Sequence, residues 1–181
     1  MSVTELTTEI DKLTADFQNS FGDISTEQLK WNNNRKCWSV AQNISHLIVI
    51  NQSYNPILEQ LNSGTLNLPF MAKIKFMVKL FGKLILSSVE PSRQKKIKTF
   101  SLWEPTSLPH AEHLLSAFVA QQEQLKKNII ANEHSFHKII HSPANKNIVY
   151  TLGKAFEILV VHERRHYNQA IEILALGKDK C

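Results

Sequence analysis

Residues 155–173 read AFEILVVHERRHYNQAIEI, and this stretch has the spacing of a helix with one buried face. Its apolar side chains recur every three or four residues, as they do where a helix packs against a protein core. The same face carries two histidines, His162 and His166, which lie one above the other because they are four residues apart. We expect a final helix over residues 151–176 that stops at Gly177, since glycine is common just after the last turn.

Three other segments repeat this periodicity, and together they predict an all-α fold. Apolar residues over 3–21 form one helical stripe. A second helix is expected over about 39–62, with a capping pattern at Ser39 and a kink at Pro56. A third is expected over about 108–131. Because the segments between these core helices are long, the sequence predicts a four-helix bundle with long crossover connections.

One additional amphipathic helix is expected over about 69–89. The segment is apolar, but four lysines interrupt it, which makes it a poor membrane-spanning helix. On a helical wheel the lysines cover about half of the surface, and we expect the other half to pack against the bundle. An anionic membrane surface is the alternative partner for this helix. The lysines are Lys73, Lys75, Lys79 and Lys83, and the apolar half consists of Phe70, Ile74, Met77, Phe81, Leu84 and Ile85.

The length and composition are those of one globular domain over residues 1–181. The net charge is +5, yet most of the excess comes from the lysine-rich middle of the chain, so we do not expect nucleic acid as a partner. Two cysteines, Cys37 and Cys181, are too few for a disulfide framework, and the N-terminus lacks the pattern of a secretory signal. A cytoplasmic location is therefore expected.

The second helix carries a histidine, His46, on its apolar stripe, so this side chain should also point inward. Polar groups on a core-facing stripe need a partner, and a divalent metal ion is a suitable partner for several imidazoles. Three protein nitrogens with one open position are typical of a catalytic metal site. The sequence thus predicts that His46, His162 and His166 bind a metal, with Gln169 as a polar neighbour that supports the site or contacts substrate. A hydrogen-bonded core histidine is the alternative for His46.

The pattern His162-Glu163-x-x-His166 also matches the motif of zinc metalloproteases, in which the glutamate is the general base. Short motifs of this kind recur by chance, and no pattern for a third ligand follows downstream. Glu163 lies about 100° from His162 on the helical wheel. A solvated helix face is as good an interpretation of that position as a catalytic one, so protease chemistry is not favoured.

The remaining residues that could carry chemistry are interpreted as structural or as exposed. Residues 132–150 are expected to be mostly loop, so the histidines within them favour surface positions over a second metal site. Trp38 is expected to pack at a helix end as a structural residue. The histidines expected at the surface are His134, His137 and His141 in this loop, and His110 and His113 at the start of the third helix.

Two motifs and the distance between them resemble the DinB-like superfamily. The first is the entry into the second helix, Trp38–Leu47, and the other is the closing stretch His162–Gln169. Members of that superfamily are built on a four-helix bundle and include bacterial thiol-dependent S-transferases. Their corresponding histidines form a metal-binding triad, so the resemblance implies ligand roles for His46, His162 and His166.

The resemblance also implies a reaction. The chain is expected to be a metal-dependent enzyme in which a small thiol, such as bacillithiol or mycothiol, attacks an electrophilic small-molecule substrate. Zinc or nickel is the expected metal, with iron and copper as alternatives, because imidazole binds all of them. Two other functions stay open: a non-catalytic metal- or ligand-binding protein, and a peripheral membrane protein that uses the helix over 69–89. A homodimer is a further option, formed through an apolar face of that helix.

Overall fold

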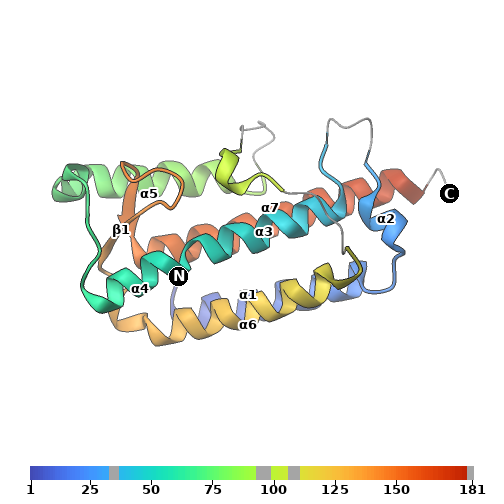
Figure 1. Ribbon diagram of the computed structural model, residues 1–181, viewed down its shortest axis with the longest axis horizontal. Helices are drawn as coiled ribbons and strands as arrows, with labels where there is room; N and C mark the ends of the chain where they lie inside the picture. Colours follow the sequence, from blue (N-terminus) through green and yellow to red (C-terminus); the bar gives the residue numbers. More distant parts are fainter. Residues whose placement is uncertain (33–36, 93–98, 106–110, 179–181) are drawn as a thin grey trace.

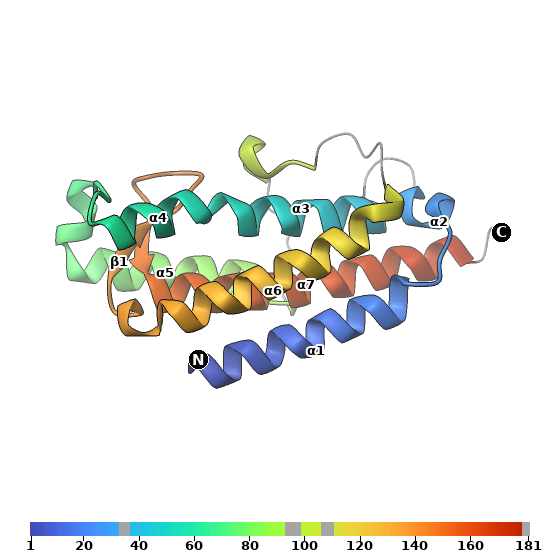
Figure 2. The same cartoon turned by 60° about the horizontal axis from the view of Figure 1, so that its bottom comes forward.

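The computed structural model describes residues 1–32, 37–92, 99–105 and 111–178. Its long helices run along the longest axis of the molecule (Figure 1), and Figure 2 shows α1 and α6 in front of α3 and α7. The predicted all-α bundle is confirmed, with α1 and α3 each packing against both α6 and α7. These core helices are α1 (Val3–Phe21), α3 (Val40–Ser53) with its continuation α4 (Asn55–Ser63), α6 (Leu114–Ala131) and α7 (Leu152–Lys178).

Two smaller features were not expected from the sequence. A short helix, α2 (Thr26–Lys30), precedes α3 and begins with a capping box at Ser25. The stretch 132–150, expected to be mostly loop, contains the first strand of an antiparallel hairpin and most of the second, with Ile140 opposite Tyr150. Its strands are β1 (Ile139–His141) and β2 (Val149–Thr151), and the 3-10 turns are η1 (Phe70–Lys73), η2 (Ser101–Trp103), η3 (Ala111–His113) and η4 (Glu133–Ser135).

The core lies between the four long helices and follows the predicted stripes. In α1 the ring of Phe17 lies 4.5 Å from that of Phe118 in α6 and 5.3 Å from that of Tyr167 in α7, measured between centroids. Burial of such aromatic side chains is among the larger favourable contributions to folding. The fully buried stripe of α1 consists of Leu6, Ile10, Leu13, Phe17 and Phe21.

The second predicted helix is interrupted where its proline removes a backbone donor. Its N-terminus has the expected capping box, in which Ser39 and Gln42 exchange hydrogen bonds. The helix breaks at Tyr54, between α3 and α4, and Pro56 occupies the first turn of α4, where its missing N–H is tolerated. A left-handed Gly64, with φ of 73°, then ends α4.

The expected stop at Gly177 is wrong, because α7 continues through this glycine to Lys178. The reason lies in packing rather than in capping. A Cβ atom at position 177 would lie 3.0 Å from the ring of Trp31, so glycine here lets the indole ring lie against the helix. The predicted first residues of the third helix and His110 lie outside the described residues.

The additional helix is α5 (Lys75–Val89), which packs against α7 and β2 beside the hairpin (Figure 1). The expected inward face is only partly correct. Val78 and Gly82 are the buried residues, whereas Leu84 is exposed. At Gly82 the absence of a side chain allows close contact with Lys154 of α7, since a Cβ atom there would lie 3.0 Å from its side chain. Within the described part of the chain, no helix is long and apolar enough to cross a membrane.

Candidate metal centre

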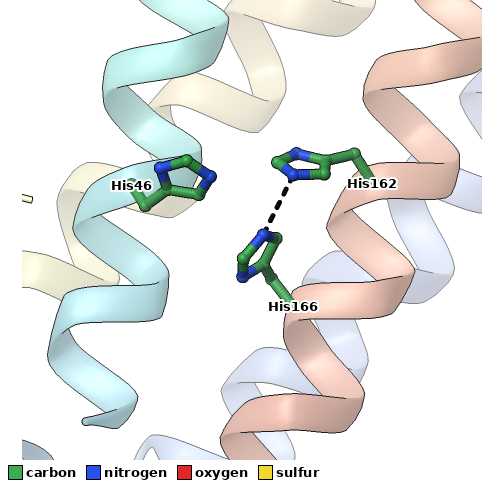
Figure 3. Close-up of side chains that lie close together, drawn as sticks. All are labelled: His46, His162 and His166. Carbon is green, nitrogen blue, oxygen red and sulfur yellow. Dashed lines mark hydrogen bonds between the residues drawn. The ribbon is translucent and has the colours of Figure 1, made fainter. Parts of the chain in front are cut away.

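Three histidine side chains from two helices converge between α3 and α7 (Figure 3). His46 comes from α3, and His162 and His166 come from successive turns of α7. One ring nitrogen of each lies within 4.8 Å of the others. His46 and His166 are buried and His162 is half-buried. Among the described residues, this is the one group of three His, Cys, Asp or Glu side chains arranged closely enough to hold a metal ion.

Hydrogen bonds set the tautomers of two of these rings. Nδ1 of His46 lies 2.6 Å from the carbonyl oxygen of Trp103, which can only accept, so Nδ1 carries the proton. Nδ1 of His166 lies 2.7 Å from Oδ1 of Asn43, whose Nδ2 donates to the carbonyl of Ser39 at 2.9 Å. The amide is therefore oriented to accept from His166. In both rings the lone pair of Nε2 remains for another partner.

The third ring closes the group through a nitrogen–nitrogen contact. Nε2 of His166 lies 2.9 Å from Nε2 of His162 (Figure 3). Because Nε2 of His166 has no proton in its neutral tautomer, Nε2 of His162 is the donor here. A divalent ion would take the place of this proton, which could move to Nδ1 of His162. The donor set thus fits a metal bound by three imidazole nitrogens, with supporting groups of the kind that orient metal ligands.

The three rings are neutral at pH 7. Burial lowers the pKa of His46 to about 4, although its bond to the carbonyl of Trp103 acts in the other direction. Burial also lowers the pKa values of His162 and His166 well below the usual range, and the neighbouring histidines and Arg165 lower them further. Neutral imidazole is the form that binds metals, so the site is prepared for an ion without losing protons first.

The histidines lie in a cavity of about 980 Å³. Trp38 was expected to be structural only, but it lines this cavity and its ring centroid lies 4.6 Å from that of His46. Trp103 forms another part of the wall, and its Nε1 donates to Oγ of Ser53 at 3.0 Å. Gln169 lines the same cavity, as its position on the stripe indicates. Sequence reasoning missed the two tryptophans, although Trp38 directly precedes the capping box that begins α3.

Glu163 lies away from the histidine cavity, and the solvated helix face, one of the two interpretations of its position, is wrong. Its side chain is fully buried and does not line the cavity. Asn51 of α3 donates to its Oε1 at 2.7 Å and Gln122 of α6 donates to its Oε2 at 2.8 Å. Burial raises the pKa of this carboxyl to about 7, and the two hydrogen bonds oppose the rise. The glutamate therefore links three core helices and is not placed as a general base beside the histidines.

The two residues that follow Glu163 are only half-buried, but both are bonded to neighbouring helices. Arg164 forms ion pairs with Glu9 and Asp16 of α1. Nη1 of Arg165 donates to the carbonyl of Ser88 at 3.0 Å, which joins α7 to the end of α5. Between His162 and His166, successive side chains thus contact every core helix around α7.

The remaining histidines do not form a second site among the described residues. His134, His137 and His113 are exposed, as expected. His141 is an exception, because it is buried in β1, with Nδ1 3.0 Å from the carbonyl of Ser142. The surface position expected for it is wrong, since the hairpin turns this side chain inward.

Comparisons with known proteins extend these observations. A family model described as the DinB superfamily matches residues 9–170, which is most of the chain and includes all three histidines. No curated protein matches the chain, and no solved structure does.

Proposed function

This chain belongs to the DinB superfamily, and we propose that it is a metal-dependent thiol S-transferase whose ion is held by His46, His162 and His166. The observation that carries the proposal is the convergence of three imidazole nitrogens within 4.8 Å. In His46 and His166 the other ring nitrogen, Nδ1, donates a hydrogen bond to an oxygen. Histidine ligands in known metal sites are commonly oriented by such a bond.

Three imidazoles suit zinc or nickel, with iron and copper as alternatives. When bound, the ion would supply a Lewis acid that lowers the pKa of a small thiol in its open position. Three protein nitrogens leave such a position, whereas structural sites are usually closed by a fourth protein ligand. The open position would face the cavity, because the histidines themselves line it.

The chain's own residues would exclude water and orient the reactants. Trp38 and Trp103 form apolar walls beside the histidines, which would shield a sulfur nucleophile from bulk water. Gln169 and Arg165 also line the cavity and supply polar contacts for the thiol compound or the substrate. In the proposed reaction the thiol loses its proton, a sulfur–carbon bond forms, and the bond from that carbon to its leaving group breaks.

The proposal predicts that conjugation of an electrophile requires both metal and thiol. Purified protein loaded with zinc or nickel should consume a generic electrophile faster than metal-free protein when a panel of small thiols is supplied. His137→Ala, which changes an exposed histidine outside the cavity, should match the unmodified protein. The measurement is conjugate formation by mass spectrometry. Equal inactivity with every metal and thiol would reject the transferase and favour a non-catalytic metal-binding protein.

The lowered pKa values predict that metal binding at pH 7 releases much less than one proton. Three ordinary histidines, with pKa values near 6.5, would compete with protons below neutrality, whereas His46 titrates only at about 4. We therefore expect the metal affinity to change little between pH 7 and pH 6 and to fall as the pH approaches 4. Isothermal titration in two buffers of different ionisation enthalpy measures the released protons. A steep loss of affinity between pH 7 and pH 6 would contradict this expectation.

A further inference from the structure

The outward side of α5 carries an apolar stripe that the described residues leave largely exposed, with Phe76 and Leu84 exposed and Leu80 half-buried between them. Phe76, Leu80 and Leu84 follow one another at intervals of four residues, so they share one side of the helix. The exposed fractions are 69% for Phe76 and 54% for Leu84. Phe70 in η1, just before the helix, is exposed by 72%. Large apolar side chains exposed together indicate an interaction surface.

Exposed lysines accompany this stripe. Lys79 and Lys83 follow Phe76 and Leu80 by three residues and therefore flank the stripe along the helix. Between Glu59 and Glu90 the sequence contains no aspartate or glutamate. The outward side of α5 is thus both apolar and positively charged, without acidic residues from its own segment.

The opposite side of the same helix holds it to the bundle. Val78 and Gly82 are buried, and Arg165 of α7 donates to the carbonyl of Ser88 near the end of α5. The outward stripe is therefore presented on a helix that is already folded and packed. The inward side also provides Ile85 and Val89 to the wall of the histidine cavity.

We propose that the outward side of α5 binds the surface of an anionic lipid bilayer. A helix with phenylalanine and leucine beside lysines lies in the interface, where the apolar groups enter the acyl boundary and the lysines meet anionic headgroups. A second copy of the chain suits this side less well, because a two-fold contact would bring lysines against lysines. Binding would place the cavity about one helix diameter, ~10 Å, from the membrane surface.

Vesicle sedimentation of the full chain tests this proposal. The protein should sediment with vesicles of equal parts phosphatidylcholine and phosphatidylglycerol, and not with phosphatidylcholine alone. Lys79→Glu/Lys83→Glu should weaken the binding roughly 20-fold or more, since each lysine near an anionic surface contributes substantially to attraction. Phe76→Gln/Leu84→Gln should weaken it at least tenfold, because a partner held by charge alone would not require these side chains.

Matched variants on other surfaces distinguish this site from general attraction by a basic protein. Lys12→Glu/Lys146→Glu matches the lysine variant, because it changes the net charge by the same amount at exposed positions of α1 and the hairpin turn. Ile130→Gln/Leu176→Gln matches the apolar variant, because it removes apolar groups exposed by 58% and 50%. Both should retain binding to within about twofold of the unmodified protein. Thermal melting shows that each variant is folded. Equal losses in the matched and α5 variants, or no binding to either vesicle type, would overturn the proposal and favour another partner, such as an acidic protein.

Discussion

Replacing His166 with alanine is expected to abolish stoichiometric metal binding. The variant loses one of three candidate ligands, and it also loses the ring that accepts from Nε2 of His162. Removal of a group that merely supports a ligand lowers metal affinity about 10- to 100-fold, so loss of a ligand should exceed 100-fold. The measurement is the metal content after dialysis, together with competition against a chromogenic chelator.

A second variant, which removes a group that supports a ligand rather than the ligand itself, should lower the metal affinity less. Asn43→Ala keeps all three imidazoles but removes the oxygen that accepts from Nδ1 of His166. Its affinity should fall about 10- to 100-fold, between that of the unmodified protein and that of His166→Ala. His137→Ala, at an exposed position, should bind metal normally. Metal content unchanged in His166→Ala would reject the site, provided that melting curves confirm a folded protein.

The three histidines could be predicted because each interrupts an apolar helical stripe, a pattern that is visible in the sequence. Their supporting partners could not be found in the same way. The carbonyl that binds His46 belongs to Trp103, in a segment between α5 and α6 that has no periodicity. A backbone oxygen carries no residue-type signal, and its position depends on the path of the whole connection. Only the folded chain brings it to the ring.

The amphipathic helix illustrates a different limit. Its lysines and apolar residues predict that one side faces the bundle, but both sides of α5 contain large apolar groups. The side that packs is the one with Gly82, where a Cβ atom would lie 3.0 Å from the side chain of Lys154. Whether a glycine lies in close contact depends on the shape of the helix that packs against it. A helical wheel of α5 alone carries no information about that partner.

Glu163 shows the same limit at a fully buried position of α7. Its replacement by alanine should destabilise the fold by about 3 kcal/mol. The change removes a buried side chain and leaves the amide donors of Asn51 and Gln122 without their acceptor. Metal content should be unaffected, because the carboxyl does not line the histidine cavity. Chemical denaturation and metal analysis measure the two effects separately. Metal loss in a folded Glu163→Ala variant would contradict the structural role.

Glu163→Gln provides the matched variant and a test of the raised pKa. Oδ1 of Asn51 and Oε1 of Gln122 have no partner among the described residues, so the new amide can donate to one of them after a flip. The pKa of the carboxyl is about 7 in the folded chain and 4.5 as its ordinary value. Between pH 4.5 and pH 7 the carboxyl is ionised in the unfolded chain but still protonated in the folded one. The free energy of unfolding of the unmodified protein should therefore fall, relative to that of Glu163→Gln, as the pH rises through this range. The full difference is about 3 kcal/mol. Comparing the two proteins at each pH cancels the contribution of the histidines, which are common to both. A difference in stability that is constant from pH 4.5 to pH 7 would show that the buried carboxyl stays ionised.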